Sequence, residues 1–314
     1  MDAPTADNSN DRPKRSQRGR RFAVAVALTV VVAGLTWAVY RATRPAPPPP
    51  LPPAPRGVVV GVPGRRLRFA AYNLYHNYRG RDRTIAEVQK LDPPPDFLLL
   101  SEVDRPEVRP MADALGMHLT YYPLLGYARG EAVWPDVAIL SRHPLHDGRP
   151  LFTDDGHTFG LWATAVVDDR KFAVAGVHLW PTYLVDPRHV VETANNRNRQ
   201  LNTILRVWRE AGAPPLVVAG DFNQPAVGEN YALMTREMND TLALLGETGS
   251  TFGRKLIQLR IDYVLATPHW EPVAGGVVPG KASDHRPVWA DLKAAPPGAA
   301  TRPATAPATR AVRD

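Results

Sequence analysis

The sequence contains no cysteine, and this absence removes several classes of site at once. Without thiols the chain has no disulfide, no thiolate zinc centre and no cysteine nucleophile. Internal repeats are absent as well. The length of 314 residues leaves room for one large domain or two modest ones, and 44% hydrophobic residues are enough to form a core.

The central part of the chain also lacks the excess of positive charge that the overall balance suggests. The net charge is +7, but residues 1–44 carry eight Lys and Arg against three Asp and Glu, and residues 293–314 carry four against one. The two ends therefore contribute +5 and +3, and the remaining 26 basic and 27 acidic residues give −1. We expect no strong electrostatic footprint for a polyanion in the central region.

A stretch without charges, Phe22–Tyr40, predicts a membrane span near the N-terminus. A helix rises about 1.5 Å per residue, so these nineteen residues are long enough to cross a hydrocarbon core of about 30 Å. Trp37 and Tyr40 form an aromatic belt at one end, and basic residues crowd the other. We therefore expect residues 1–21 to be a basic cytoplasmic segment, residues 22–40 an uncleaved signal anchor, and the rest of this single-pass protein to be extracytoplasmic.

Two alternatives to the anchor are a cleaved signal peptide and a buried soluble helix. The apolar run is longer than a usual signal-peptide core, and Ala38–Ala42 is a poor cleavage site. The position, length and aromatic belt of the run argue against a soluble helix.

Low-complexity segments bound the remaining domain on both sides. Residues 41–59 include the proline tract RPAPPPPLPPAP, which predicts a semi-rigid polyproline spacer, with a proline-recognition ligand as the alternative. Residues 294–314 are rich in Ala, Pro and Thr, which predicts a disordered tail. One domain, residues 60–293, lies between them.

Apolar runs within this domain predict strands over residues 67–73, 96–102, 137–140, 163–167, 172–178, 216–220, 261–266 and 287–292. Helices are predicted over residues 84–90, 186–210, 231–236 and 241–245. Strands outnumber helices, and several are apolar throughout. This pattern favours two sheets packed on each other with helices outside.

The stretch Leu216–Pro225 predicts a functional strand end. Five apolar or small residues lead to Asp221, and Asn223 follows two positions later. If the strand persists, its period of two points both side chains the same way, where a carboxylate can orient a water and an amide can hold a phosphate oxygen. An Asx turn that closes the strand is an equally good interpretation of these residues alone.

Several other apolar strands also end in a polar residue. Each such residue has a simpler explanation by itself: a surface carboxylate, a turn, a strand cap or a hydrogen-bonded core histidine. Coincidence does not easily supply the whole ordered set, which consists of Asn73, Glu102, His178, Asp221, Asn223, Asp262, Asp284 and His285.

Together these residues resemble a known family. The segments FLLLSE, GDFN, RIDYV and SDHRP, with the early Asn73, are similar to the endonuclease/exonuclease/phosphatase superfamily, which includes pancreatic-type deoxyribonucleases, abasic-site endonucleases, neutral sphingomyelinases and inositol phosphatases. The resemblance covers residues 66–292. It implies an α+β four-layer sandwich, in which two packed mixed β-sheets are flanked by helices, and a divalent-metal phosphoesterase.

The resemblance also implies roles for individual residues. Metal binding is implied for Glu102, Asn73 and Asp284. Catalytic roles are implied for Asp221, which positions the attacking water, for His285 and His178 at the phosphate, for Asp262, which orients His285, and for Asn223, which binds phosphate or metal. The acidic partner of His178 is not assigned, although Asp136 is a candidate from its place in the order.

The residue types suit phosphodiester hydrolysis. Negative charge develops on the phosphate oxygens, so the site needs a cation and hydrogen-bond donors, and oxygen ligands favour Mg²⁺ or Mn²⁺. A histidine held by a carboxylate has a fixed tautomer and titrates near neutral pH. Either Asp221 or His285 can accept the proton from water. We expect attack by a water in line with the leaving group.

The sequence gives less information about the substrate than about the reaction. Residues 195–200 (NNRNRQ) and Arg254 with Lys255 supply some basic character, and Trp180 and Tyr183 some aromatic surface, although a solvated surface and core packing explain them as well. We expect a membrane-anchored nuclease or broad phosphodiesterase first. Phospholipid or sphingomyelin hydrolysis at the headgroup is the alternative, and a non-catalytic binding descendant is a third hypothesis.

Overall fold

The computed structural model describes residues 65–122, 136–181, 187–254 and 257–295, all within one compact unit of the chain, residues 53–314. Among these residues no helix has the length and apolar character needed to span a bilayer. The expected anchor at 22–40, with its flanks at 1–21 and 41–59, lies outside the described residues, as does almost all of the expected tail.

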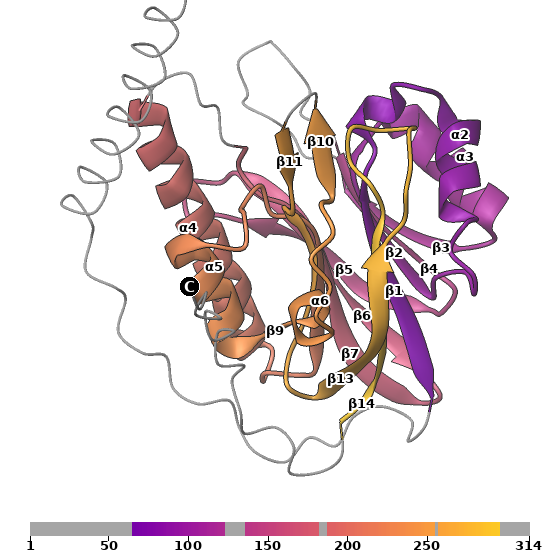
Figure 1. Ribbon diagram of the computed structural model, residues 1–314. Helices are drawn as coiled ribbons and strands as arrows, with labels where there is room; N and C mark the ends of the chain where they lie inside the picture. Colours follow the sequence, from indigo (N-terminus) through magenta and orange to yellow (C-terminus); the bar gives the residue numbers. More distant parts are fainter. Residues whose placement is uncertain (1–64, 123–135, 182–186, 255–256, 296–314) are drawn as a thin grey trace, which may run out of the picture. The chain divides into compact units, whose positions relative to one another are not determined.

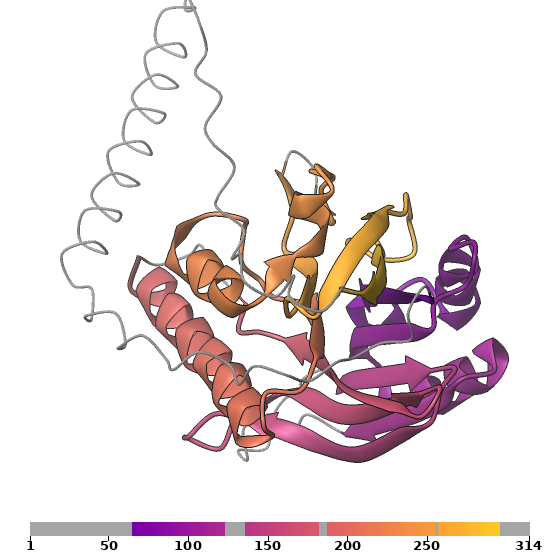
Figure 2. The same ribbon diagram turned by 90° about the horizontal axis from the view of Figure 1, so that it is seen from below.

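Two six-stranded sheets form the centre of the molecule (Figures 1 and 2). Both are mixed, because β1 pairs in parallel with β2 and β7 in parallel with β8, while the other pairings are antiparallel. The first sheet has the order β13 (Trp270–Val277), β14 (Val288–Ala294), β1 (Arg66–Asn73), β2 (Phe97–Val103), β4 (Asp136–Ser141), β3 (His118–Tyr122). The second has the order β5 (Leu145–Phe152), β6 (Thr158–Val167), β7 (Arg170–His178), β8 (Leu216–Asp221), β12 (Asp262–Ala266), β9 (Asn239–Asp240). A short hairpin joins β10 (Phe252–Arg254) to β11 (Ile257–Leu259).

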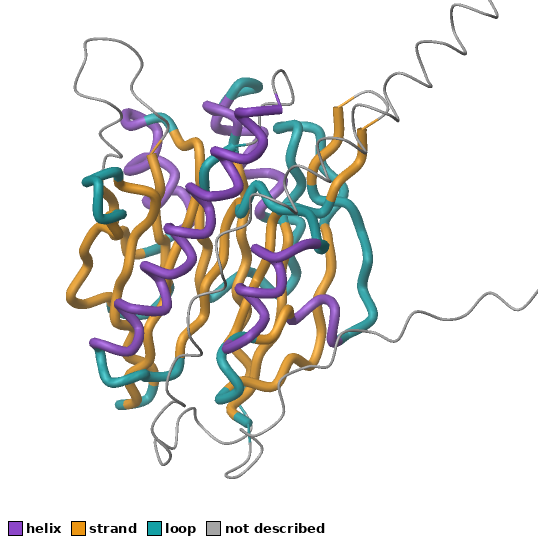
Figure 3. Tube along the Cα trace, turned by 90° about the vertical axis from the view of Figure 1, so that its left-hand side faces the viewer, coloured by secondary structure: helices purple, strands orange, loops and turns teal. Residues whose placement is uncertain are grey.

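Helices lie on the two outer sides of the paired sheets (Figures 1 and 3). The first sheet is flanked by α2 (Arg81–Val88) and α3 (Arg105–Leu115), and the second by α4 (Pro187–Glu210) and α5 (Gly228–Glu237), with the short α6 (Thr241–Leu244) near β9. The amphipathic α4 buries Leu201, Ile204 and Trp208. The predicted α+β four-layer sandwich, two packed mixed β-sheets flanked by helices, is thereby confirmed.

The main core fills the space between the sheets and follows the alternation of the strands. In β1 the side chains of Leu67, Phe69 and Ala71 face this space, and Val217 and Ala219 do so in β8. The centre is aromatic: the Phe69 ring stacks on Phe97 at 4.8 Å between centroids. Burying each of the Leu, Val and Phe side chains contributes about 1.5–3 kcal/mol.

Most predicted elements are present. The α-helix that was not predicted is α3, and the strands that were not predicted are β3, β5, β9, β10, β11 and β13. Helix α3 contains Pro106 in its first turn, where no N–H partner is needed, and Pro110 in its interior, so its sequence does not indicate a helix. Strands β5 and β13 lie at the edges of their sheets, and most of their residues are exposed or half-buried. They therefore lack the apolar run that marks the central strands.

Candidate active site

The strand alternation that builds the core also builds the site. Asn73 has the same parity as Leu67, Phe69 and Ala71, and Asp221 the same parity as Val217 and Ala219, so both face the space between the sheets at one edge. By the same rule His178 and Asp262 lie at this edge, and the register pairs each of them with Asp221. The polar residues are thus where the apolar core ends.

Glu102 reaches this edge through a β-bulge. The pairing of β2 with β4 shifts between Leu100 and Val103, and Glu102 has a left-handed backbone with φ of 52°. Strand parity alone would place Ser101 towards the core in line with Phe97 and Leu99. The bulge brings the Glu102 side chain to the site, because an extra residue in the strand changes the direction in which the neighbouring side chains point.

Asn73 joins the two sheets at the site. Its amide nitrogen donates to Glu102 Oε1 at 3.0 Å and to Asp221 Oδ2 at 2.9 Å, and its Oδ1 accepts from the Tyr75 N–H at 3.0 Å. The side chain is 1% exposed. One buried amide therefore holds a carboxylate from each sheet in place.

Two histidines face these carboxylates. His178 Nε2 lies 3.5 Å from Glu102 Oε1 and 3.9 Å from Asp221 Oδ2. His285 Nε2 lies 3.7 Å from Asp221 Oδ2, and its Nδ1 lies 2.8 Å from Asp262 Oδ2. The predicted orientation of His285 by Asp262 is present in the geometry. The acidic neighbours of His178 are Glu102 and Asp221, and the side chain of the other candidate, Asp136, lies outside the described ones.

The surroundings of Asp221 and His285 shift the pKa of each group. Burial raises the pKa of Asp221 most strongly, Asp262 raises it further, and His285 and His178 lower it, which leaves it at about 6. Burial lowers the pKa of His285, but Asp262 and Asp221 together raise it more, to about 10. At neutral pH the pair is therefore a carboxylate beside an imidazolium.

The strand end around Asp221 is an Asx turn. The Asn223 N–H donates to Asp221 Oδ1 at 2.8 Å, and the Asn223 side chain donates to the Leu179 carbonyl at 2.9 Å. The condition for both side chains to point the same way was that the strand persists, and it is not met, because β8 ends at Asp221 and Asn223 has φ of 49°. The alternative interpretation, an Asx turn that closes the strand, describes these residues. Gly220 is required before the turn, since a Cβ there would lie 2.0 Å from the Val177 carbonyl oxygen.

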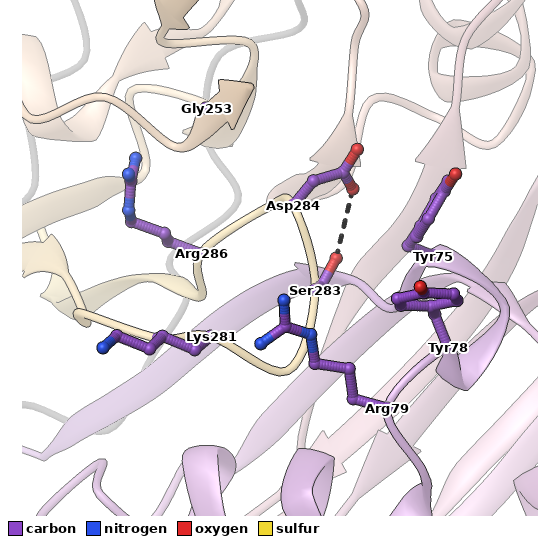
Figure 4. Close-up of a pocket in the computed structure, with 9 residues that line it drawn as sticks. Tyr75, Tyr78, Arg79, Gly253, Lys281, Ser283, Asp284 and Arg286 are labelled. Atoms are coloured by element: carbon purple, nitrogen blue, oxygen red, sulfur yellow. Dashed lines mark hydrogen bonds between the residues drawn. The ribbon is translucent and has the colours of Figure 1, made fainter. Parts of the chain in front are cut away.

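Asp284 lies beside the cluster rather than within it. Two groups of side chains in the described part of the chain have ligand atoms within 4.8 Å of one another, Glu102 with His178 and Asp221, and Asp221 with Asp262 and His285. Asp284 belongs to neither, because the loop turns it into a neighbouring cleft, where Ser283 Oγ lies 3.5 Å from its carboxylate (Figure 4). Its predicted metal-binding role stays a prediction.

The donor set fits a hard divalent cation. Asp221 belongs to both groups, with Glu102 in one and Asp262 in the other, and Asp262 Oδ1 is buried without a hydrogen-bond partner. Burial without a partner is costly for a carboxylate oxygen, and oxygen ligands suit Mg²⁺ or Mn²⁺. The residues that could hold such an ion are Glu102 and Asp221, steadied by Asn73.

The expected basic groups of α4 are engaged within the protein. Arg197 is 5% exposed and donates to the Trp180 carbonyl at 3.0 Å. Arg199 pairs with Asp155 at 3.2 Å. Tyr183, Lys255 and the side chain of Arg254 lie outside the described residues.

Sequence reasoning missed the segment that follows Asn73. His76 lies 3.8 Å from Glu102 Oε2 and 3.4 Å from Asp104 Oδ1, and Tyr75, His76 and Asn77 all have positive φ. Their only signal in the sequence is that they directly follow a strand that ends at the site.

A buried glutamate that the sequence did not single out anchors the loop before His285. Glu87, from α2, accepts a hydrogen bond from the Tyr72 hydroxyl at 2.5 Å, from the Ala282 N–H at 2.9 Å and from the Lys281 N–H. The loop that carries Asp284 and His285 is thereby fixed to the first sheet and to α2.

Comparisons with known proteins agree with this geometry. Residues 70–285 match the model of the Endonuclease/Exonuclease/phosphatase family. No curated protein matches the chain in sequence. The solved structures that resemble it are similar in fold. An endonuclease/exonuclease/phosphatase from Bacteroides vulgatus is 16% identical, with a TM-score of 0.60 over 74% of this chain and 100% of that one.

Two further solved structures have the same fold and hold a bound anion or nucleic acid. The human Nocturnin catalytic domain with bound sulfate is 20% identical, with a TM-score of 0.59 over 75% of this chain and 96% of that one. The 3' phosphatase NExo from Neisseria, bound to a product DNA hairpin, is 19% identical, with a TM-score of 0.54 over 71% and 98%. The family model spans more than half of the sequence and coincides with the sandwich that carries the acidic cluster, so the chain belongs to the endonuclease/exonuclease/phosphatase family.

Proposed function

We propose that this protein is a divalent-metal-dependent phosphodiester hydrolase, acting as a nuclease or a broad phosphodiesterase. The observation that carries the proposal is the convergence of Glu102, Asp221 and His285, from both sheets and a loop, around the single Asn73 amide. One structural neighbour, the 3' phosphatase from Neisseria, is bound to DNA, and this supports a phosphodiester substrate.

The roles of the residues follow from their positions. Asp221, held by Asn73 and by the Asn223 N–H, orients the attacking water and accepts its proton. His285 is kept as an imidazolium by Asp262 and donates to a phosphate oxygen as charge develops there. His178 and Asn223 add contacts to the phosphate from the other side of Asp221. Water attacks in line with the bond that breaks.

Mg²⁺ or Mn²⁺ completes the site. Glu102 and Asp221 would hold the ion, with Asn73 beside them and Asp284 at the rim. When bound, a divalent cation neutralises charge on the phosphate oxygens, which several carboxylates would otherwise repel.

The test is hydrolysis of bis-p-nitrophenyl phosphate by the purified full-length chain. We expect turnover with Mg²⁺ or Mn²⁺, loss of turnover in excess chelator, and a fall of about 10³-fold in Asp221→Ala or His285→Ala protein. Lys171→Ala is the matched control, since Lys171 lies near the start of β7, at the opposite end from His178. Undiminished turnover in chelator, or in either site variant, would refute the proposal.

We also propose that residues 22–40 anchor the protein as a single pass with the N-terminus in the cytoplasm. The nineteen-residue uncharged run and its basic flank support this. In membrane preparations the chain should resist extraction by alkaline carbonate, and protease added from outside should digest the hydrolase domain. Release by carbonate, or protection of the domain in intact cells, would contradict the anchor or its orientation.

A further inference from the structure

A cleft of about 490 Å³ opens beside the candidate active site (Figure 4). We call it the Tyr78 cleft. It is lined by Tyr75, Tyr78, Arg79, Lys281, Asp284 and Arg286 together with small residues. Its volume lies within the range of ligand pockets. Hydrolysis of a small diester would not need two aromatic rings and three cations beside the reacting phosphate.

Tyr78 provides an exposed aromatic face in this cleft. It is 72% exposed, the highest value among the large hydrophobic residues that the structure describes, and its ring lies 5.7 Å from that of Tyr75. The segment that presents it is held in place by left-handed backbone at Tyr75, His76 and Asn77 and by the Gly80 N–H donating to the Asn77 carbonyl at 2.7 Å. Such backbone costs about 1–3 kcal/mol per residue and persists where the surroundings enforce it.

Three cations line the cleft, against one carboxylate, Asp284. Arg79 and Lys281 are exposed, and neither forms an ion pair with a residue that the structure describes. Arg286 is fixed by hydrogen bonds to the Ser250 carbonyl and to Gln258. In Figure 4 the tyrosine rings lie at the right and Lys281 and Arg286 at the left, with Arg79 reaching towards Ser283 between them.

A second cavity continues from the same arginine. It has a volume of about 500 Å³ and a lining of mixed charge, which comes from the segment 77–80, from the first residues of α2 and from the start of α3: Asn77, Arg79, Gly80, Arg81, Asp82, Arg83, Asp104 and Glu107. Asn77 is only 8% exposed, and both polar atoms of its amide are buried without a hydrogen-bond partner. An unpaired buried amide is costly unless a ligand satisfies it. The surface is thus longer than one nucleotide-sized pocket.

Two connections place the cleft beside the hydrolytic cluster. Asp284 is the neighbour of His285 in sequence, and the Tyr75 N–H donates to Asn73 Oδ1, the amide that holds Glu102 and Asp221. A substrate whose phosphate lies at His285 would extend its adjoining group over Tyr78. That group must offer a flat ring to an aromatic face and negative charge to Arg79 and Lys281.

We propose that the Tyr78 cleft binds the nucleotide next to the scissile phosphate of a single-stranded polynucleotide. Its unpaired base stacks on Tyr78, and its phosphate lies beside Arg79 and Lys281. Base stacking on exposed aromatics with cations along the backbone is the general mode of single-strand binding, and a lipid headgroup offers no ring to stack. This inference rests on the proposed phosphodiester hydrolysis and names the substrate class for the same site.

The direct test is binding of a fluorescein-labelled dT decamer to the full-length chain in excess EDTA, followed by anisotropy. We expect Tyr78→Ala to weaken binding about tenfold and Tyr78→Phe to stay within about twofold of wild type, since the ring is kept. Arg79→Ala should lower the slope of log affinity against log salt by about 0.7, the value for one phosphate contact of a single strand. Leu244→Ala, another exposed apolar side chain, and Lys171→Ala should leave binding and slope unchanged.

Hydrolysis separates this inference from the proposed function. With metal, the ratio of kcat/KM on the decamer to kcat/KM on bis-p-nitrophenyl phosphate should fall about tenfold in Tyr78→Ala protein, mainly through KM. If the wild type hydrolyses the small diester but Tyr78→Ala leaves the ratio unchanged, the cleft proposal fails and the hydrolase proposal stands. If the wild type hydrolyses neither substrate but Tyr78→Ala still loses decamer binding, the hydrolase proposal fails and the cleft proposal stands. Headgroup release from phosphatidylcholine vesicles that depends on Tyr78, with decamer binding unaffected, would also overturn the cleft proposal.

Discussion

Carboxylates lie both outside the first sheet and at the edge between the two sheets, and their surroundings differ. On the outer face Glu87 has hydrogen bonds at both oxygens, from the Tyr72 hydroxyl and from two backbone N–H groups. At the inner edge the Asp221 carboxylate lies close to that of Glu102 and to that of Asp262, and Asp262 Oδ1 has no hydrogen-bond partner. A buried acid paired only with donors thus serves structure, while several acids left close to one another are arranged for a cation.

The largest effect should follow from removing a carboxylate at the inner edge. Glu102→Gln keeps an acceptor for Asn73 but removes the charge that would hold the metal. We expect kcat/KM to fall about 10³-fold, equivalent to about 4 kcal/mol, with little change in the free energy of unfolding. Steady-state kinetics and urea denaturation of the same preparation measure the two quantities. If the variant keeps its activity, the Glu102 carboxylate is not needed for hydrolysis, and the proposed difference between the two groups of acids is contradicted.

The outer face should respond in the opposite way. Glu87→Ala leaves a buried hydroxyl and two backbone N–H groups without their acceptor, and should cost about 3 kcal/mol of unfolding free energy in urea. Glu87→Gln keeps one acceptor oxygen and should cost less. Equal stability of wild type and Glu87→Ala would show that the glutamate does not hold the 280–284 loop.

Metal should stabilise the protein through the inner edge alone. At a concentration one hundred times its Kd, a bound cation adds about 2.7 kcal/mol to the unfolding free energy. We expect Mg²⁺ or Mn²⁺ to raise the Tm of wild-type and Glu87→Gln protein, and chelator to reverse the rise. The rise should disappear in Glu102→Gln. A rise that persists there would place the ion elsewhere.

Without metal, the free energy of unfolding should depend on pH, because Asp221 is buried close to other acids. The folded pKa of Asp221 is raised to about 6 from an ordinary value of 3.8, so the folded protein binds this proton more tightly than the unfolded chain. Its contribution is fully present below pH 3.8 and is lost as pH rises through about 6. In EDTA, Asp221→Asn should therefore flatten this part of the stability curve, by on the order of 3 kcal/mol. A curve of unchanged slope would contradict the assignment.

The smallest effect belongs to a surface ion pair remote from both faces. Arg65 donates to Asp168 at 2.8 Å, but both side chains are largely solvated. Arg65→Ala should change the unfolding free energy by less than about 1 kcal/mol and leave activity unchanged. This variant serves as the control to which the effects of the other substitutions are compared.

The sequence predicted the sandwich and most of the site for one physical reason. In the central strands the apolar alternation runs without interruption into Asn73, His178, Asp221 and Asp262, so the same periodicity places the core and the polar edge. What it could not predict depends on local departures from that period. The bulge at Glu102 and the turn that directs Asp284 into the cleft are set by pairing partners distant in the chain. The Asx turn at Asn223 is local, and it was one of the two interpretations that its residues allowed.

Glu87 and Tyr78 show a second limit. A glutamate in a short helix is expected to be solvated, and the burial of Glu87 depends on a loop almost two hundred residues away. Tyr78 has the pattern of a loop aromatic, and the cleft beside it depends on residues of the segment 280–286 that complete the lining. Neither relation has a local signal.

The most direct test of the cation-holding edge is anomalous diffraction from crystals of the protein soaked in Mn²⁺. We predict one strong peak within ligand distance of the Glu102 and Asp221 carboxylates, absent in crystals of Glu102→Gln protein. A peak beside Glu87 or at another surface, or none in crystals of protein that hydrolyses the diester with Mn²⁺, would contradict this arrangement.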